Sequence, residues 1–318
     1  MMDVIVTSRS FGNVPSDALD LLERNDLNII RPDRAGPFSD EEIAEIFKDH
    51  PTRAIIVGSD KIGSKAFAEA KELEIISKHG VGVDNVDLEE ASRRGVAVTN
   101  TPQANKEAVA ELAFGAVFAL TRRIVSADRS VRSSNWEKFV GHEIQEKTLG
   151  IIGLGKIGKR LAQLASSVGM KVLYYDTEEK DVAEEIEISR SALNILFRCS
   201  DFVSVHCPLT PDTRGLVGEN AFDSMKDSAF LINTARGGIV DEEALSQALN
   251  DGTIAGAYLD VFESEPLPDN SSLRNREDVI LTPHMAAYTE EAIARMDEVS
   301  VENLVNYFQE REPVFRVV

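Results

Sequence analysis

Apolar runs and amphipathic stretches alternate along the first hundred residues of the chain. The apolar runs, which predict strands, cover 4–7, 28–30, 54–57, 74–77 and 96–98. The stretches between them, in which apolar residues recur at helical spacing, lie near 16–24, 39–48, 64–72 and 87–94. Such alternation is typical of a parallel sheet covered by helices, so the N-terminal part is predicted to be a small α/β domain.

A second series of the same kind begins near residue 149. Its strand candidates are 149–153, 171–175, 202–206, 229–233, 254–259 and 279–282. Six strands suit two mononucleotide-binding halves. The second series is therefore predicted to form a larger α/β domain.

Two helices outside these series bear on the domain organisation. Helix 107–120 is apolar nearly all round, so it should be buried on most sides, between two domains or at a subunit interface. The last helix, 290–309, follows the complete second series, and we expect it to pack on the first domain. The predicted fold class is α/β with two doubly wound parallel-sheet domains. One is formed by 1–101 plus 288–318, and the other, 102–287, is inserted into it.

A glycine-rich turn opens the second series. The turn reads Gly153-Leu154-Gly155-Lys156-Ile157-Gly158 and lies between an apolar strand and a helix. The first glycine permits the tight turn, the second lets the backbone approach a pyrophosphate, and the third allows close helix–strand packing. The free N–H groups and the dipole at the helix start favour phosphate charge. This pattern predicts a Rossmann domain that binds a dinucleotide.

Asp176 ends the next predicted strand, close to the spacing of about 20 residues expected after the glycines. Its carboxylate should accept hydrogen bonds from the adenosine ribose. The segment 177–179 that follows is acidic and lacks arginine, so it should repel the 2′-phosphate of NADP. We therefore predict NAD as the cofactor.

The composition limits the partners and the compartment. The 318 residues carry a formal net charge of −20, which argues against sequence-independent nucleic-acid binding and against anionic membrane surfaces. No run approaches the about 18 apolar residues of a membrane span, and the N-terminus has no signal-peptide pattern. Cys199 and Cys207 are the two cysteines and lack metal-ligand spacing. We expect no metal site and a reduced, cytoplasmic protein.

Polar residues gather at the carboxyl ends of the later predicted strands, where open α/β sheets bind ligands. They are His206-Cys207-Pro208, then 233–238 with Thr234, Ala235 and Arg236, then Asp260, Glu263 and Glu265, and finally Thr282-Pro283-His284. Each alone reads equally well as an ordinary loop or surface residue. Their joint occurrence at one sheet edge favours a functional site.

These residue types suit hydride transfer on a 2-oxo acid. Arg236 offers a two-pronged cation for the substrate carboxylate. His284 can protonate the carbonyl oxygen or, in the oxidation direction, accept the hydroxyl proton. A carboxylate such as Glu265 would orient that histidine and stabilise its protonated form.

At these residues the chain resembles the D-isomer-specific 2-hydroxyacid dehydrogenase family, within it the D-3-phosphoglycerate dehydrogenase-like branch. The motifs that carry the resemblance are 78–87, 108–112, 153–158, 205–210, 233–238, 260–266 and 282–284. The resemblance implies an NAD-dependent dehydrogenase of a small D-2-hydroxy acid, with Arg236, Glu265 and His284 as the catalytic trio. It implies that the cofactor is also lined by His206, Cys207, Pro208, Thr213, Thr234, Ala235, Asp260 and His284.

The resemblance also implies how the first domain takes part. Backbone N–H groups near Val81 and Gly82 would hold the substrate carboxylate, beside Arg236 and His284, which makes the flavodoxin-like first domain the substrate domain. A homodimer is implied, with the helix from Glu107 and the region around Trp136 at the interface.

The sequence leaves the substrate open. Phosphoglycerate dehydrogenases of this family commonly carry an arginine after the third strand to meet the phosphate, whereas this chain has Gly58. Lys61, Arg9 or Lys78 could substitute for it. The alternatives are a glyoxylate or hydroxypyruvate reductase acting on an unphosphorylated acid and, from another class, an NAD-sensing binding protein similar to a corepressor.

Overall fold

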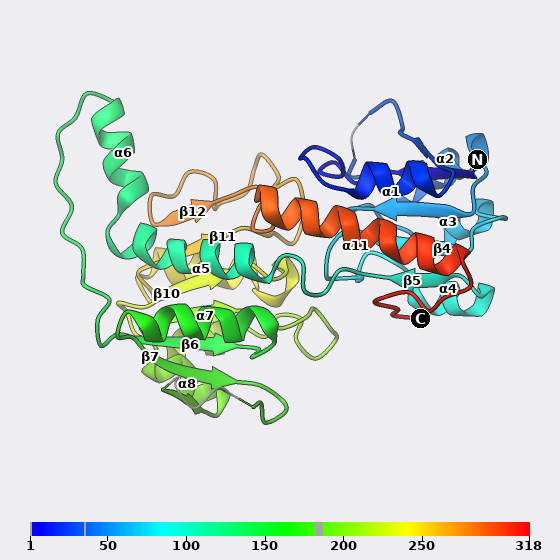
Figure 1. Cartoon of the computed structure of the whole chain (residues 1–318). Helices are drawn as coiled ribbons and strands as arrows, with labels where there is room; N and C mark the ends of the chain where they lie inside the picture. The colour runs from blue at the N-terminus through cyan, green and yellow to red at the C-terminus, as the bar shows by residue number, and fades with distance from the viewer. Residues whose placement is uncertain (1, 35, 182–186) are drawn as a thin grey trace. The chain divides into compact units, whose positions relative to one another are not determined.

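The computed structural model describes residues 2–34, 36–181 and 187–318, which divide into two compact units. The first unit comprises Met1–Lys106 and Ala287–Val318, and the second comprises Glu107–Ala286. Figure 1 shows the chain from the N-terminus to the C-terminus and labels many of its helices and strands. Among the described residues, no helix is long and apolar enough to cross a membrane.

The first unit is built on a five-stranded sheet whose named strand pairs are all parallel. Its strands are β1 (Met2–Val6), β2 (Leu27–Ile30), β3 (Ala54–Val57), β4 (Ile75–Lys78) and β5 (Ala97–Thr99). The order β2-β1-β3-β4-β5 is that of flavodoxin-like sheets, whose ligand site lies where β1 and β3 diverge to opposite sides.

Helices cover both faces of this sheet. They are α1 (Ala18–Arg24), α2 (Asp40–Asp49), α3 (Ser64–Glu69), α4 (Leu88–Arg94) and α11 (Glu290–Phe308). Alternate strand residues point to opposite faces, so Ile5 and Ile55 pack with α2, α3 and α4, whereas Val4 and Ile56 pack with α1 and α11. The C-terminal helix thus completes the core of the N-terminal sheet.

The second unit contains a seven-stranded parallel sheet. Its strands are β6 (Thr148–Ile152), β7 (Lys171–Tyr175), β8 (Ile188–Arg190), β9 (Phe202–Val205), β10 (Phe230–Asn233), β11 (Gly256–Leu259) and β12 (Val279–Leu281). The order β12-β11-β10-β9-β6-β7-β8 is the doubly wound Rossmann order with one further strand at the β12 edge.

Helices again flank the sheet. They are α5 (Lys106–Thr121), α6 (Ile124–Arg132), α7 (Lys156–Ser167), α8 (Leu193–Cys199), α9 (Glu219–Ser224) and α10 (Glu242–Asn250). Leu149 and Ile151 of β6 pack in one apolar layer with α5 and α7, and Val203 and Val205 of β9 pack in the other with α8, α9 and α10.

The structure confirms the predicted fold class of two parallel-sheet α/β domains. The expectation of six strands in the second sheet is wrong, because β8 adds a seventh. That strand has only Ile188 as an apolar residue and pairs with β7 alone, so it lacks the apolar run of a central strand. Helix α6 was not predicted either.

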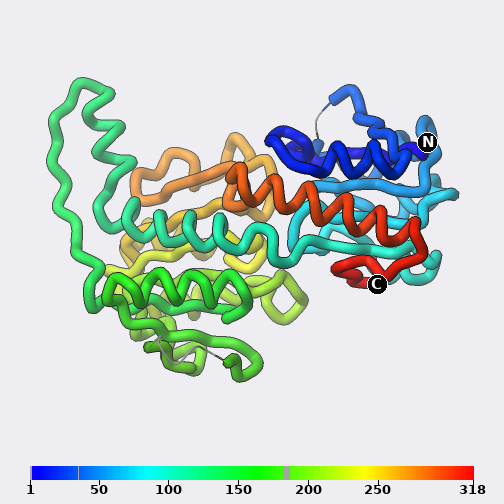
Figure 2. The backbone as a smooth tube through the Cα atoms, in the orientation of Figure 1, coloured from blue at the N-terminus to red at the C-terminus, as the bar shows by residue number. Residues whose placement is uncertain are grey.

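Helix α6 and the segment after it form an arm that projects from the rest of the second unit, as the tube in Figure 2 shows. The arm carries exposed apolar side chains: Trp136 is 81% exposed and Val140 is 91% exposed. Ile124 and Val131 are also exposed. Exposed apolar side chains gathered on one projecting segment are typical of surfaces that bind a partner.

Candidate functional site

The glycine turn lies at the point where the strand order of the second sheet reverses. β6 pairs directly with β9, although β7 and β8 come between them in the sequence. Gly153 follows β6 with a left-handed φ of +94°, and a Cβ there would lie 2.7 Å from the backbone nitrogen of Cys207, just after β9. The two strand ends meet so closely that only glycine fits. Ligands of open α/β sheets bind at such a point.

The start of α7 leaves donors and space for an anion. Gly155 is the N-cap, and no side chain caps this helix. A Cβ on Gly155 would meet nothing within 4 Å, whereas one on Gly158 would overlap the carbonyl oxygen of Gly153. The turn is therefore closely packed at Gly158 and open at Gly155, and the open space at Gly155 fits the pyrophosphate of NAD.

Asp176 is fixed at the same edge by the glycine turn. Its Oδ2 accepts a hydrogen bond from the N–H of Leu154 at 2.9 Å, and its Oδ1 accepts one from the N–H of Glu178 at 3.1 Å. Burial, the largest influence, raises the pKa of Asp176. The two backbone bonds and Lys180 together outweigh burial and leave that pKa lowered. The carboxylate is thus ionised and ready to accept from a ribose.

A cleft of about 370 Å³ opens beside this carboxylate. It is lined by Tyr175, Asp176, Arg190, Ser191 and Ala192. Arg190 donates to the carbonyl oxygen of Asp176 at 3.0 Å, and Lys180 Nζ lies 3.5 Å from Asp176 Oδ1. An arginine was not predicted at this position, because Arg190 lies 14 residues further along the chain and reaches Asp176 only through β8. The cleft suits an adenosine ribose.

The remaining predicted cofactor residues follow β9 and β10. His206 Nε2 lies 2.8 Å from the Ser204 hydroxyl, and burial lowers the pKa of His206 to about 4. Burial raises the pKa of the Cys207 thiol to about 11. Thr213 donates to the carbonyl oxygen of Pro208 at 2.7 Å and so holds the loop after β9. The site edge at neutral pH is therefore lined by uncharged imidazole and thiol groups.

Thr234, just after β10 and before Ala235, has an unsatisfied hydroxyl. The side chain is buried, and Oγ1 has no hydrogen-bond partner among the described residues. A buried polar atom without a partner is costly, and in a ligand site it points to a missing ligand group. This atom, the open face of Gly155 and the ionised Asp176 agree with bound NAD.

Arg236 is presented by a turn that Asn233 holds from within the core. Asn233 is fully buried; its amide donates to the carbonyl oxygen of Arg236 at 2.9 Å, and its Oδ1 accepts from the N–H of Ala235 at 3.0 Å. A Cβ on Gly237 would overlap the backbone of Phe262. The Arg236 turn therefore packs directly on the segment that leads to Glu265.

His284 and Glu265 form a pair on this edge. His284 Nδ1 lies 2.7 Å from Glu265 Oε2. His284 has a φ of +52°, a strained conformation for a non-glycine residue and one that recurs at functional sites. The imidazole is 40% exposed, and no described residue bonds its Nε2. That nitrogen is free to exchange a proton with a ligand.

The Glu265 carboxylate is held in its ionised form. Burial is the largest influence and raises the pKa of Glu265. The hydrogen bond to His284 and the charges of His284 and Arg236 reverse that effect, so the pKa is lowered. Arg236, Glu265 and His284 thus interact within the second unit.

Asp260 anchors the turn that carries His284. It is fully buried, and its carboxylate accepts hydrogen bonds from Thr282 Oγ1 at 2.6 Å and from the N–H groups of Met285 at 2.9 Å and Ala286 at 2.8 Å. Its carbonyl oxygen accepts from the N–H of His284 at 2.8 Å. The anchoring roles of Asn233 and Thr282 were missed, although both residues lie in the quoted motifs, because a motif gives no hydrogen-bond partners.

The remaining predicted residues lie in the first unit. No described residue accepts a hydrogen bond from the N–H of Val81 or Gly82, which follow β4. Gly58 follows β3, where a Cβ would lie 3.2 Å from Ser8 Cα. Lys78 is buried and donates to the carbonyl oxygen of Gly58. Of the three substitute cations considered from the sequence, Arg9 and Lys61 are exposed.

Comparison with known proteins agrees with this geometry. Residues 114–286 match the family model described as the NAD-binding domain of D-isomer specific 2-hydroxyacid dehydrogenases. The chain belongs to this family. It is therefore an NAD-dependent D-2-hydroxyacid dehydrogenase, and the binding-protein alternative is not supported.

Individual relatives carry different substrate names. A glyoxylate reductase of Thermofilum pendens is 41% identical over 92% of this chain and 88% of its own length. A D-3-phosphoglycerate dehydrogenase of Archaeoglobus fulgidus is 39% identical over 92% of this chain and 55% of its own length. The crystal structure of the TT0316 protein from Thermus thermophilus is similar over the whole of both chains, with a TM-score of 0.89 and 35% identity.

Proposed function

We propose that this dehydrogenase reduces glyoxylate or another small unphosphorylated 2-oxo acid with NADH. The main support for an unphosphorylated substrate comes from the residues at the carboxyl end of β3. Gly58 packs there against Ser8, and the neighbouring Lys78 is buried with its ammonium group on the Gly58 carbonyl oxygen. The position that commonly carries the phosphate-binding arginine thus has no side chain, and Lys78 is already bonded, although Arg9 and Lys61 are exposed in the same unit. The likeness to a glyoxylate reductase supports this choice over the phosphoglycerate dehydrogenase-like function favoured from the motifs.

Three side chains of the second unit would carry the chemistry, for which NADH supplies the hydride. Arg236 would bind the substrate carboxylate and carbonyl oxygen through its fork of donors. His284 would give its Nε2 proton to the carbonyl oxygen during reduction and take it back during oxidation. Glu265, ionised and bonded to Nδ1, would fix the ring orientation and stabilise the protonated imidazole.

The first unit would act as the substrate domain. The free N–H groups of Val81 and Gly82 are consecutive donors that suit a carboxylate, and they follow β4 at the carboxyl edge of their sheet. Asp260 would meet the nicotinamide amide in addition to anchoring His284.

A panel of 2-oxo acids tests the substrate. NADH oxidation is followed with glyoxylate, hydroxypyruvate and 3-phosphohydroxypyruvate, and with 3-phosphoglycerate and NAD in the reverse direction. We expect kcat/KM to be at least about tenfold higher for the unphosphorylated acids, a difference of about 1.4 kcal/mol. A preference for the phosphorylated acid would return the assignment to phosphoglycerate oxidation.

We also propose that the exposed arm mediates a homodimer. Its apolar side chains, Trp136 and Val140 among them, match the interface implied by the family resemblance. Light scattering after size exclusion should give a dimer for the wild type and a monomer for Trp136→Glu with Val140→Glu. Val168→Glu, at an exposed apolar position after α7, is the matched control and should remain dimeric. A monomeric wild type would overturn the proposal.

A further inference from the structure

A buried histidine–aspartate pair lies beneath the loops of the first unit. His79 Nε2 is 2.7 Å from Asp297 Oδ1, and the two side chains are 1% and 0% exposed. His79 directly follows β4, whereas Asp297 lies on α11, 218 residues further along the chain. Taking two ionisable groups out of water is costly. When the remaining polar atoms of such a pair also make hydrogen bonds, the pair is expected to hold the segments that it bonds.

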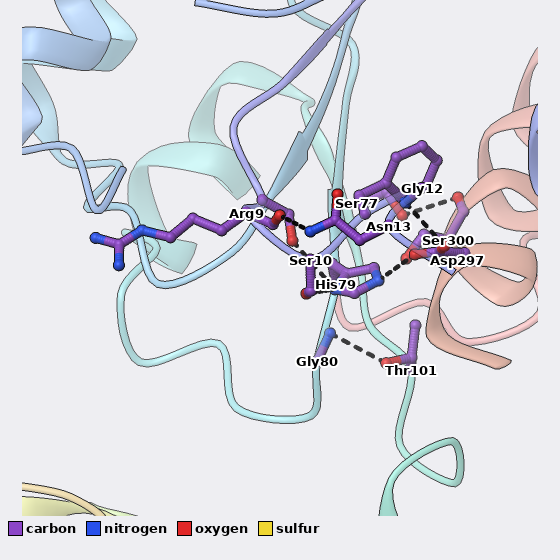
Figure 3. Close-up of polar contacts among 12 residues, drawn as sticks. Arg9, Ser10, Gly12, Asn13, Ser77, His79, Gly80, Thr101, Asp297 and Ser300 are labelled. Atoms are coloured by element: carbon purple, nitrogen blue, oxygen red, sulfur yellow. Dashed lines mark hydrogen bonds and ion pairs between the residues drawn. The ribbon is translucent and has the colours of Figure 1, made fainter. Parts of the chain in front are cut away.

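The pair makes hydrogen bonds to the loop that follows β1, residues 8–13. Asp297 Oδ2 accepts from the N–H of Gly12 at 2.9 Å, and His79 Nδ1 lies 3.2 Å from the Ser8 hydroxyl. The Ser10 hydroxyl lies 3.5 Å from the same nitrogen. Figure 3 shows the His79 ring between Ser10 of the loop and Asp297 of α11, with Gly12 against Asp297, while the Arg9 side chain extends away from them.

The same pair lies next to the loop that follows β4. The backbone N–H of His79 donates to the carbonyl oxygen of Val57 at 2.9 Å. The next residue, Gly80, donates its N–H to the Thr101 hydroxyl and accepts from the Thr101 N–H through its carbonyl oxygen. Val81 and Gly82, with their unpaired N–H groups, follow at once. The pair therefore ties the β1 loop to the base of the loop that presents those donors.

The position of these loops in the topology gives them a function. They follow β1 and β4, and Ser8 touches Gly58 after β3, so they surround the β1/β3 divergence point of a flavodoxin-like sheet. Ligands bind at that point. We propose that His79 and Asp297 are positioning residues that fix this edge for substrate binding, a role that rests on the proposed function of the first unit.

Asp297→Leu is the decisive variant, because it keeps a similar volume and removes both acceptors. The Gly12 N–H and His79 would then be buried without partners, and the loops should shift. We expect KM for glyoxylate to rise about tenfold or more, kcat to change less, and the NADH dissociation constant to remain unchanged. Asp297→Asn should restore most of the loss, since its amide can accept from Gly12 and donate to the other His79 tautomer.

A second, milder variant keeps the proposal testable if Asp297→Leu does not fold. Ser8→Ala removes the bond to His79 without exposing a buried charge, and should raise KM about threefold. Two controls separate positioning from general stability. Thr52→Ala loses a 2.6 Å bond to the Asp3 carbonyl oxygen at the opposite edge of the same sheet. Ser300→Ala removes an α11 hydroxyl that has no partner among the described residues. Both should leave KM unchanged.

Amide hydrogen exchange supplies a readout that needs no turnover. In Asp297→Leu, exchange should accelerate at least about tenfold in 8–13 and 79–82, and Asp297→Asn should reverse this. Unchanged exchange in both loops, or a KM rise no larger than that of Thr52→Ala at equal loss of Tm, would overturn the proposal. If the wild type reduces none of the acids, the proposed function fails, while hydrogen exchange still decides whether the pair holds the loops.

Discussion

Glu265 Oε2 lies 2.7 Å from His284 Nδ1, and this contact leaves Nε2 of the imidazole without a partner among the described residues. The two ring nitrogens therefore have different roles, because Nδ1 is held by the Glu265 carboxylate and Nε2 is left for a ligand. A neutral partner in place of Glu265 would keep the orientation and lose the charge.

Glu265→Gln separates these two effects. The amide oxygen still accepts from Nδ1–H, but the negative charge that stabilises a protonated imidazole is lost. We expect kcat to fall about 10²-fold and His284→Ala to lower it about 10²–10⁴-fold, both with unchanged NADH affinity. The double variant should be no worse than His284→Ala alone.

Steady-state kinetics and NADH fluorescence titration provide the measurements. Glu263→Gln is the matched control, because this neighbouring carboxylate accepts from the Glu242 N–H rather than from His284. Additive losses in the double variant would contradict a shared role for Glu265 and His284.

Gly237→Ala should disable the site without touching a charged group. The new Cβ would overlap the backbone of Phe262, so the Arg236 turn or the segment before Glu265 must move. Displacement of about 1 Å can cost about 10²-fold in turnover, and we expect kcat/KM to fall by that amount with a lower Tm. Gly238→Ala is the neighbouring control. Its Cβ meets the end of the flexible Arg214 side chain at 3.0 Å, which can swing aside.

Every strand except β8, and the glycine turn, could be predicted because each depends on local sequence. Alternating apolar runs determine β1 to β5, and the turn needs glycine at 153 and 158 for steric reasons visible in the sequence pattern. Contacts between distant segments could not be predicted. Arg190 reaches Asp176 only through β8, and His79 meets Asp297 only because α11 packs on the first sheet.

Helix α6 illustrates a different limit. Its sequence is amphipathic, so the helix itself could have been predicted; what the sequence does not show is that its apolar side chains Ile124 and Val131 are exposed. The close packing of Gly237 against Phe262 is also invisible in the sequence, because a glycine in a turn has many local explanations.

Thr234→Val should affect the free protein and its NAD complex in opposite directions. The buried Oγ1 has no partner among the described residues, so replacing it by a methyl group removes an unsatisfied polar atom and should raise the Tm of the free protein slightly. If this hydroxyl bonds the bound cofactor, NADH affinity should fall about three- to tenfold. Differential scanning calorimetry with and without NADH measures both effects. Unchanged affinity would contradict the role of Thr234.

Asp176→Ser with Thr177→Arg should change the cofactor preference. The carboxylate would no longer bond the ribose or repel a 2′-phosphate, while serine can still accept from the Leu154 N–H. We expect the NADPH to NADH ratio of kcat/KM to rise at least about tenfold. Thr177→Arg alone keeps the carboxylate and should shift the ratio much less. An unchanged ratio in the double variant would show that Asp176 does not read the ribose.

The half-buried imidazole of His206 should make stability depend on pH. Burial lowers the pKa of His206 to about 4, whereas a histidine of the unfolded chain titrates near 6.5. Between about pH 6.5 and about pH 4 the unfolded chain therefore binds a proton that the native protein does not. Stability falls as the pH falls through this window, and it is retained above it.

His206→Gln removes this titration and can keep the hydrogen bond with Ser204, which is 2.8 Å long in the wild type. Its Tm should fall less than that of the wild type between about pH 7 and about pH 4.5. His142→Gln, at an exposed position, is the control and should follow the wild-type curve. Parallel curves for wild type and His206→Gln would mean that His206 takes up its proton equally in the native and unfolded states, and that the edge of the NAD site is more hydrated than its burial indicates.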